Sequence, residues 1–322
     1  MSFSQDAKSE MSRIMPVKKC CELAEIAGFL RASGSIRLAG GGTFRIVLST
    51  DSAATARHYK RLLEDYFRIE TELNVEEGTA RSKRGHVYRI TIGPEMRSDS
   101  ILREAGILMV REGNNYLTDG IYNNIVRKKC DRKAYLRGMF LGAGTVSAPD
   151  RGYDLEFVVN SSVLGSDLRK LINTFDDINA RMVKRGAKYV VYLKSAQEVS
   201  DMLAIMGAHG QMLKLEEVRI RKDLLNQTVR ITNCDAANTD RALDASERQN
   251  EAIRRLRQAG AIEGLSDKLK ELALLREAHP EASLTQLGEM LDPPLAKSGV
   301  NNRMKRILAA ADRLPAVPSE DK

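Results

Sequence analysis

The 322-residue chain has a mass of 35.8 kDa, which predicts two or three domains rather than one. It has 43% hydrophobic and 29% charged residues, and this composition excludes a chain that is disordered throughout. The 51 Lys and Arg residues outnumber the 43 Asp and Glu residues, so the net charge of +8 is compatible with an anionic partner, although the total alone does not establish one.

The sequence favours a cytoplasmic protein without membrane contact. No apolar run approaches the roughly 20 residues that a membrane-spanning helix needs, and the first residues lack the apolar core of a signal peptide. Four cysteines are too few for a disulfide scaffold, and none stands in a Cys-x-x-Cys pair. We therefore expect neither a bound metal ion nor another cofactor.

Two segments of the chain resemble each other at an offset of 110 residues. Lys18–Cys20 recurs as Lys128–Cys130, and Gly28 recurs as Gly138. The hydrophobic pattern that follows each segment also recurs, in the order helix, hairpin, helix, hairpin, helix. The sequence therefore predicts an α+β fold, in which a pseudo-two-fold pair of αββαββα repeats is followed by an all-α helix-turn-helix domain.

The predicted elements follow the same order in both repeats. The first has a helix ending at Gly34, strands at Ser35–Leu38 and Phe44–Leu48, a helix at Ser52–Phe67, strands at Ile69–Val75 and Val87–Ile92, and a helix at Glu95–Ala105. The second has a helix at Arg132–Ala143 before Gly144, strands near Thr145 and at Tyr153–Asn160, a helix at Ser162–Phe175, strands at Ala180–Val183 and Lys188–Leu193, and a helix at Ala196–Met206.

Small residues inside the first helix of each repeat predict a close helix pair. Gly28 and Ala32 lie four residues apart, as do Gly138 and Gly142, so each pair shares one helix face. A glycine inside a helix costs about 1 kcal/mol relative to alanine, so we expect these glycines to let two helix backbones approach. The glycine that ends each helix is expected to adopt positive φ. The alternative is an ordinary helical hairpin with incidental glycines.

The cysteines and histidines indicate no enzyme chemistry. The vicinal pair Cys20-Cys21, together with Cys130, would suit a redox pair, a metal site or simply buried small side chains, and we favour the last of these. The four histidines offer no arrangement of a nucleophile with a general base. We therefore predict no catalytic residue.

The last third of the sequence predicts a linker and three further helices. Val229–Thr232 has the composition of a strand, whereas Ala236–Gly260 is highly charged and favours a long helix between domains. Ser266 is expected to cap a helix at Asp267–Ala278. Ser283 with Gln286 forms a capping-box pattern at the start of a second helix. Ser298 is expected to open a third, Gly299–Leu314.

The third of these helices has the pattern of a DNA-reading helix. Its apolar residues form one stripe, and Asn302, Lys305 and Arg306 fall on the opposite face. Asn can form two hydrogen bonds with adenine and Arg with guanine in the major groove. The predicted DNA contacts are Ser283, Lys297, Ser298, Asn301, Asn302, Arg303, Lys305 and Arg306. A helical hairpin with a solvated basic face is the alternative.

Two basic hairpin tips in the repeats are weaker candidates. Lys83 and Arg84 occupy one tip, and Lys184 and Arg185 occupy the equivalent tip of the second repeat. They would suit secondary phosphate contacts, but charged hairpin tips are more often simply solvated.

Ile26–Gly34 and Leu136–Gly144 resemble two copies of the LAGLIDADG motif of homing endonucleases. In that family the two motif helices form the domain interface, and an acid directly before the last glycine of each copy binds the catalytic divalent metal. Ser33 and Ala143 stand at those degenerate positions and cannot supply a carboxylate. The resemblance therefore implies the scaffold without the nuclease, so we predict that the protein is not an enzyme.

Nearly the whole chain resembles the WhiA family, which joins a degenerate LAGLIDADG domain to a helix-turn-helix. Arg132–Gly138, Asn233–Asn238 and His279–Asn301 carry the most specific likeness. The resemblance implies a nucleoid-associated regulator that binds double-stranded promoter DNA and controls genes of cell division, chromosome segregation or sporulation. Two alternatives remain: an adaptor whose repeats hold another transcription factor or RNA polymerase, and an active homing endonuclease.

The predicted domain boundaries follow from these features. They are a first repeat at 1–110, a second repeat at 111–210, a linker with a long helix at 211–262, a helix-turn-helix domain at 263–316 and a flexible tail at 317–322.

Overall fold

The computed structural model describes residues 2–77 and 85–314. The chain divides into two compact units, Met1–Lys222 and Asp223–Lys322, and each is considered by itself below. Among the described residues, none of the helices combines the length and the apolar composition that a membrane crossing requires.

The first unit contains two four-stranded antiparallel sheets, a separate two-stranded hairpin and the helices that cover the sheets. The strands are β1 (Gly34–Gly40), β2 (Thr43–Thr50), β3 (Glu72–Glu77), β4 (His86–Ile92), β5 (Leu108–Arg111), β6 (Asn114–Leu117), β7 (Gly144–Val146), β8 (Leu155–Val159), β9 (Arg181–Arg185) and β10 (Lys188–Leu193). The helices are α1 (Phe3–Met11), α2 (Lys19–Ser33), α3 (Ala53–Phe67), α4 (Ser98–Glu104), α5 (Lys129–Ala143), α6 (Ser162–Ile172) and α7 (Ala196–Met206), with short 3₁₀ turns at Pro94–Met96 and Asn123–Val126.

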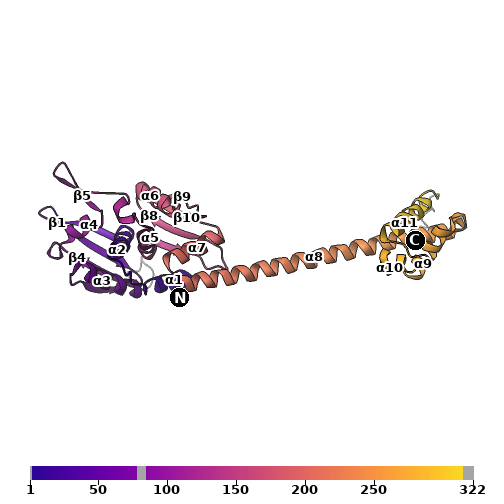
Figure 1. Ribbon diagram of the computed structural model, residues 1–322, viewed down its shortest axis with the longest axis horizontal. Helices are drawn as coiled ribbons and strands as arrows, with labels where there is room; N and C mark the ends of the chain where they lie inside the picture. The colour runs from indigo at the N-terminus through magenta and orange to yellow at the C-terminus, as the bar shows by residue number, and fades with distance from the viewer. Residues whose placement is uncertain (1, 78–84, 315–322) are drawn as a thin grey trace. The chain divides into compact units, whose positions relative to one another are not determined.

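The two large sheets have the same topology, which confirms the predicted repeat. Their strand orders are β1-β2-β4-β3 and β7-β8-β10-β9, so equivalent strands occupy equivalent places. On β2, Phe44, Ile46 and Leu48 are buried while the intervening residues face away from the core, as strand alternation requires. Helices α3 and α4 pack on the buried face of this sheet. Figure 1 shows α2 and α5 side by side between the two sheets.

The glycines of α2 and α5 make the close helix pair that their spacing predicts. A Cβ built on Gly28 would lie 2.3 Å from the carbonyl oxygen of Tyr135, and one on Gly138 would lie 2.2 Å from the carbonyl oxygen of Glu25. On Gly142 it would lie 2.5 Å from the Cβ of Ala32. The two helix backbones are therefore in direct contact, and the interpretation of incidental glycines is wrong.

The predicted positive φ of the helix-ending glycines is also wrong. Gly34 has φ −78° and Gly144 has φ −87°, both with extended ψ, because β1 and β7 begin at these residues without an intervening turn. Glycine is needed there for room: a Cβ on Gly34 would meet the carbonyl oxygen of Leu30 at 2.3 Å, and one on Gly144 would meet the Phe140 ring at 2.2 Å.

Local turn chemistry changes several other predicted elements of the first unit. The helix expected at Glu95–Ala105 is divided in two by Arg97, which adopts a left-handed conformation with φ 58°. The sequence analysis did not foresee α1 or the β5–β6 hairpin. That hairpin turns through Glu112 and Gly113, which both have positive φ.

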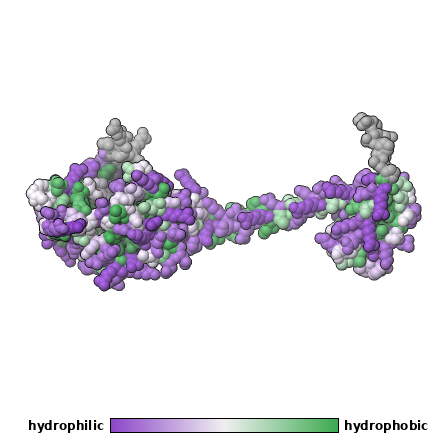
Figure 2. All heavy atoms as spheres, turned by 90° about the horizontal axis from the view of Figure 1, so that it is seen from above, coloured by the Kyte–Doolittle hydropathy of each residue, from purple (hydrophilic) through white to green (hydrophobic). Residues whose placement is uncertain are grey.

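The remaining helices are α8 (His209–Gln258), α9 (Asp267–Ala278), α10 (Leu284–Glu289) and α11 (Lys297–Ala311), with a 3₁₀ turn at Ala261–Gly264. The strand composition of Val229–Thr232 is misleading, because these residues are helical within α8. No neighbouring strand among the described residues is available to pair with them, and β propensity outside a sheet is weak. Figure 2 shows hydrophobic side chains scattered among hydrophilic ones along α8; Leu213, Ile220 and Ile231 are among its exposed apolar residues.

The second unit has a small hydrophobic core of its own. Leu272 from α9, Leu287 from α10 and three residues of α11 are almost completely buried, and the end of α8 adds Ile253 and Leu256. The α11 residues of this core are Val300, Met304 and Ile307. They are the apolar stripe that the sequence predicts, so the opposite face of α11 is left to solvent.

Candidate DNA-binding interface

The turn into α10 is fixed by a reciprocal cap. The backbone N–H of Gln286 donates to Ser283 Oγ at 3.3 Å, and the backbone N–H of Ser283 donates to Gln286 Oε1 at 2.8 Å. This is the predicted capping box. By contrast, Ser266 stands at the start of α9 without a side-chain cap bond.

Close packing after α10 sets the position of α11. A Cβ on Gly288 would lie 2.0 Å from the carbonyl oxygen of Leu295, so only glycine lets the chain return this tightly. The backbone N–H of Leu295 also donates to the carbonyl of Gly288 at 2.8 Å. This close approach has no signal in the sequence, where Gly288 has the appearance of an ordinary helical residue.

Helix α11 starts two residues earlier than predicted. It begins at Lys297 after Ala296, and no side chain caps it, so Ser298 lies inside the first turn rather than before it. The first backbone N–H groups of a helix carry a partial positive charge and bind phosphate well. The start of α11 is therefore suited to an anionic ligand.

The predicted reading residues lie on the open face of α11. Asn302, Lys305 and Arg306 are exposed, as are Ser283, Lys297 and Ser298, whereas Asn301 and Arg303 are half-buried. Among the described residues, no carboxylate lies within ion-pair distance of the basic side chains of α11. Their charges are thus not neutralised by the described part of the chain.

Arg276 holds this part of the second unit together and was not foreseen. Its side chain is 2% exposed and donates to the carbonyl oxygens of Ala282 at 2.6 Å and Pro280 at 3.3 Å. It also reaches Ser246 Oγ on α8 at 3.5 Å, and burial lowers the pKa of its guanidinium. Arg276 therefore fixes the segment that leads into the capping box.

A groove runs beside the start of α10. It encloses about 770 Å³ and is lined by residues of α8, the α9–α10 connection and α10, together with Lys297. Asn238 and Arg241 line it from α8, and Ser283 and Gln286 line it from the start of α10. The lining of the groove is mostly apolar, with a few polar side chains among the apolar ones, and Lys297 is its contribution from α11.

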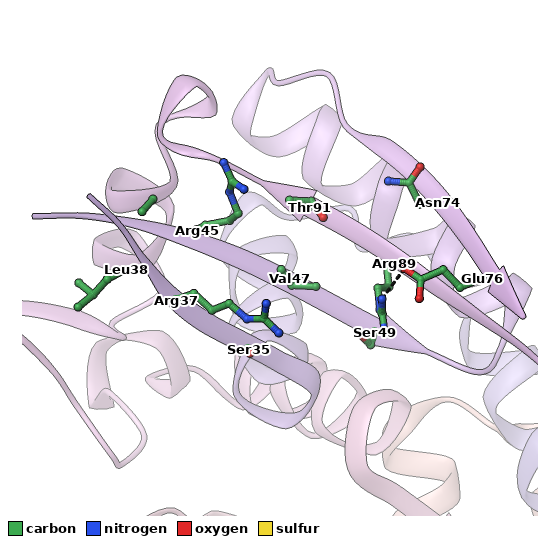
Figure 3. Close-up of a pocket in the computed structure, with 11 residues that line it drawn as sticks. Ser35, Arg37, Leu38, Arg45, Val47, Ser49, Asn74, Glu76, Arg89 and Thr91 are labelled. Carbon is green, nitrogen blue, oxygen red and sulfur yellow. Dashed lines mark hydrogen bonds and ion pairs between the residues drawn. The ribbon is translucent and has the colours of Figure 1, made fainter. Parts of the chain in front are cut away.

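A second basic surface lies on the first sheet of the repeats. Arg37, Arg45 and Arg89 project from neighbouring strands on the face that α3 and α4 leave open (Figure 3). Arg89 is paired with Glu76. Arg37 and Arg45 are exposed and occupy paired positions on β1 and β2, and Figure 3 shows their guanidinium groups extending in different directions over the sheet. The strand alternation could have identified both residues, but the sequence analysis did not.

The hairpin tips give a mixed result. Lys83 and Arg84 lie outside the described residues. At the second tip Lys184 is exposed, whereas Arg185 forms an ion pair with Glu156 at 3.0 Å. One of the two positive charges of this tip is therefore already compensated within the sheet. Arg185 is therefore a weaker candidate for a phosphate contact than Lys184.

The degenerate motif positions stand at the C-terminal ends of the paired helices. Ser33 is the last residue of α2 and its hydroxyl donates to the carbonyl of Phe29 at 3.0 Å, while Ala143 ends α5. Neither supplies a carboxylate. Deeper in the same helix pair, the buried carboxylate of Glu25 on α2 lies 2.7 Å from His58 Nε2 and accepts from Arg137 Nε on α5 at 2.9 Å. The Arg137 guanidinium thus compensates the charge of Glu25 across the helix pair.

Comparison with known proteins identifies the family. Family models described as the WhiA N-terminal LAGLIDADG-like domain, the WhiA LAGLIDADG-like domain and the WhiA C-terminal HTH domain match residues 19–108, 132–225 and 228–311. The chain belongs to the WhiA family. The predicted family and the predicted fold class, two LAGLIDADG-like repeats followed by a helical helix-turn-helix region, are confirmed.

Relatives match over nearly their whole length. The chain is 39% identical over 313 residues to a "Probable cell division protein WhiA" of Alkaliphilus metalliredigens (strain QYMF), covering 97% of this chain and 98% of the relative. It is 40% identical to a protein of the same name from Thermoanaerobacter pseudethanolicus, with 98% of each chain covered. The crystal structure of full-length DUF199/WhiA from Thermatoga maritima shares the fold, with a TM-score of 0.59, 24% identity and coverage of 98% of this chain and 100% of that one.

Proposed function

We propose that this WhiA family member is a sequence-specific DNA-binding regulator of transcription, whose targets are genes of cell division, chromosome segregation or sporulation. One observation carries the proposal: α11 anchors an apolar stripe in the core and presents Asn302, Lys305 and Arg306 to solvent without a compensating carboxylate among the described residues. The names of its relatives, probable cell division proteins, support the choice of genes.

The chemistry of this face suits the major groove. Arg306 can donate two hydrogen bonds to guanine and Asn302 can exchange two with adenine, which gives discrimination of about 1–3 kcal/mol for each base. Lys297 and the uncapped start of α11 suit a phosphate, which contributes affinity but no sequence information. Binding would place the protein on the nucleoid.

We also propose that the protein is not a nuclease. A two-metal cleavage needs carboxylates that hold the ions beside the scissile phosphate. Ser33 and Ala143 stand where those carboxylates would have to be, and the last turns of α2 and α5 contain no Asp or Glu. The repeats would instead serve as a scaffold and, through Arg37 and Arg45, as a second surface for DNA phosphate.

The test uses the full chain and a cognate duplex chosen by selection from random DNA. Fluorescence anisotropy would measure the affinity of the wild type and of Arg306→Ala, Asn302→Ala and Lys297→Ala at several salt concentrations. We expect the first two substitutions to weaken cognate binding by about 1–3 kcal/mol and to relax the preference at one base each. Lys297→Ala should weaken all duplexes alike and reduce the salt slope by about one unit.

Lys268→Ala is the matched control, because it removes one exposed charge from α9 without touching α11. It should leave the base preference unchanged. If the α11 variants also bind the cognate duplex like the wild type, α11 does not read DNA. If Arg37→Ala and Arg45→Ala instead abolish the base preference, the sheet reads the sequence and the proposal for α11 fails.

The adaptor role is the second candidate, because α8 exposes large apolar side chains such as Leu213 and Ile220 that suit a protein contact. Its partner would be another transcription factor or RNA polymerase. Maps of bound DNA in cells would separate the candidates. A reading helix requires Arg306→Ala to erase the bound sites, whereas an adaptor held on DNA by its partner would keep them.

A further inference from the structure

Four potential metal ligands meet at the start of the paired helices. Cys20 and Cys21 lie in the first turn of α2, and Cys130 and Asp131 lie in the first turn of α5. Their sulfur and carboxylate oxygen atoms all lie within 4.8 Å of one another. Both helices contribute the same two positions, because Cys20 and Cys130, and likewise Cys21 and Asp131, are equivalent in the repeat.

The geometry of the cluster matches a tetrahedral ion. Cys21 Sγ lies 3.4 Å from Asp131 Oδ1, and Cys130 Sγ lies 3.5 Å from the same oxygen. In a tetrahedral site with zinc–sulfur bonds of about 2.3 Å and zinc–oxygen bonds of about 2.0 Å, the sulfur–oxygen edge is about 3.5 Å. Two of the ligand–ligand separations therefore already match those that the ion would impose, and the others lie within 4.8 Å.

Without an ion the cluster favours thiols, because the hydrogen bond to Asp131 raises the pKa of Cys20 and burial raises the pKa of Cys21. All four residues lie in the first turn of a helix, and the N-terminal end of a helix carries a partial positive charge that stabilises a nearby anion. Lys18 and Lys128 directly precede the two helices and add positive charge. Ligation by zinc requires deprotonated thiols, and the charge of the ion itself, together with these positive charges, would offset the cost of removing the protons.

Asp131 distinguishes a metal site from a redox pair. Its side chain is 3% exposed, and no Lys or Arg of the described chain forms an ion pair with it. One oxygen accepts the backbone N–H of Lys128 at 3.4 Å, which orients the carboxylate toward the sulfurs. A buried carboxylate contributes nothing to a disulfide, whereas a divalent cation compensates its charge.

We propose that Cys20, Cys21, Cys130 and Asp131 bind one zinc ion in a closed structural site that ties α2 to α5. Three soft sulfur ligands exclude magnesium and calcium, which prefer oxygen, and four protein ligands leave no open position for catalysis. The site lies at the opposite end of the helix pair from Ser33 and Ala143. It therefore differs from the expectation of a metal-free protein drawn from the cysteine spacing.

The glycine seam explains why the site is preformed. Because α2 and α5 are held backbone to backbone at Gly28 and Gly138, their first turns cannot move apart freely. Cys21 and Asp131 are buried whereas Cys20 and Cys130 are half-buried, so an ion can enter from the solvent side. The expectation that all three cysteines are buried is thus wrong for two of them.

The first experiment measures metal in the full-length protein. After purification under reducing conditions and dialysis against chelator-treated buffer, mass spectrometry of the metals should find about one zinc per chain. Cys21→Ser and Cys130→Ser should each reduce the affinity for zinc at least a hundredfold. Substitution of residues that only hydrogen-bond a metal ligand already costs up to about a hundredfold, and these two variants remove a ligand itself. Cys234→Ser, which changes an exposed cysteine of α8, is the matched control and should keep its zinc.

Binding of Co²⁺ to the wild type tests the site without any substitution. Co²⁺ added to metal-free wild type should show the visible bands of tetrahedral cobalt and a near-ultraviolet thiolate charge-transfer band. Asp131→Cys should keep the ion and release it to a chelator more slowly, because a fourth thiolate replaces the carboxylate. Circular dichroism would check that each variant is folded.

Three results would overturn the proposal. The first is a wild type that contains no stoichiometric zinc and also gives no tetrahedral cobalt spectrum. The second is a folded Cys130→Ser variant that binds zinc as tightly as the wild type. The third is a disulfide between these cysteines in the reducing buffer. None of these results bears on whether α11 reads DNA, so the two proposals fail separately.

Discussion

The contact between α2 and α5 predicts that a single methyl group at Gly138 destabilises the first unit. In Gly138→Ala the new Cβ would lie 2.2 Å from the carbonyl oxygen of Glu25 and 2.9 Å from the backbone nitrogen of Phe29. Ordinary contacts of a Cβ begin near 3.4 Å, and both obstacles are backbone atoms that cannot rotate away. The helices would have to separate locally by about 1 Å.

Two opposing terms set the size of the effect. Overpacking of a close-packed seam typically costs about 1–3 kcal/mol, and a backbone obstacle places this case at the upper end. The higher helix propensity of alanine returns about 1 kcal/mol. The net loss is therefore about 2 kcal/mol, which lowers the melting temperature of a unit of this size by roughly 4–8 °C.

Differential scanning calorimetry of the full chain would measure this loss. Gly165→Ala is the matched control, because Gly165 is also inside a helix of the first unit but the one close contact of its Cβ would be with the flexible side chain of Met182, at 2.8 Å, while Val159 and Tyr189 lie at ordinary contact distances. We expect the control to melt at or slightly above the wild-type temperature. A Gly138→Ala protein that melts at the wild-type temperature would refute the direct backbone contact.

Two further predictions concern single side chains. Arg276→Met should destabilise the second unit by about 1–3 kcal/mol, because buried carbonyl groups lose their donor, and Arg276→Lys should recover part of the loss in the same calorimetry. For Glu64, burial raises the pKa but hydrogen bonds from Lys60 and the Thr71 backbone outweigh it, so the pKa lies below its usual value of 4.5. A group whose pKa is lowered by folding stabilises the folded state above pH 4.5. This stabilisation is lost as the pH falls through the pKa of the folded state. Glu64→Gln should therefore reduce stability in urea at pH 7, by less than about 1 kcal/mol because the pair is partly exposed, and match the wild type near pH 3.

Features that depend on local periodicity could be predicted from the sequence. The apolar stripe of α11 follows from a 3.6-residue repeat, so the exposure of Asn302 and Arg306 on the opposite face was predictable. The close helix pair was also predictable, because a glycine inside a helix needs a packing reason and Gly28 and Gly138 recur at equivalent places. The predicted contact of these α11 residues with DNA stays a prediction.

Features that depend on a partner far along the chain could not be predicted. Whether Arg185 is free or paired is decided by Glu156, which belongs to another strand of the sheet. The sequence places Cys21 and Asp131 at a separation of 110 positions, and only the packing of α2 on α5 brings them together. The same holds for Arg276, whose acceptors lie in the following loop and on α8.

Local propensity gives a wrong prediction of secondary structure where no tertiary partner supports it. The β-branched residues at Val229–Thr232 suggest a strand, but a strand needs a neighbour to pair with, and within the described residues this segment continues the hydrogen bonds of α8. Gly34 was expected to turn the chain, yet the chain runs straight from α2 into β1, and the glycine is needed because Leu30 leaves no room for a side chain.

The two functions of the LAGLIDADG motif are physically separable in this chain. The glycines at positions such as Gly28 and Gly138 serve backbone contact, and their removal is costly whatever the protein does. Ser33 and Ala143 are compatible with the seam, because the Ser33 hydroxyl donates to the carbonyl of Phe29 in its own helix and Ala143 has no polar side-chain group. Persistence of the motif is therefore an argument about the fold and not about cleavage. The proposed reading of DNA by α11 is independent of this motif, because it depends on the exposed polar side chains of the open face of α11 in the second unit.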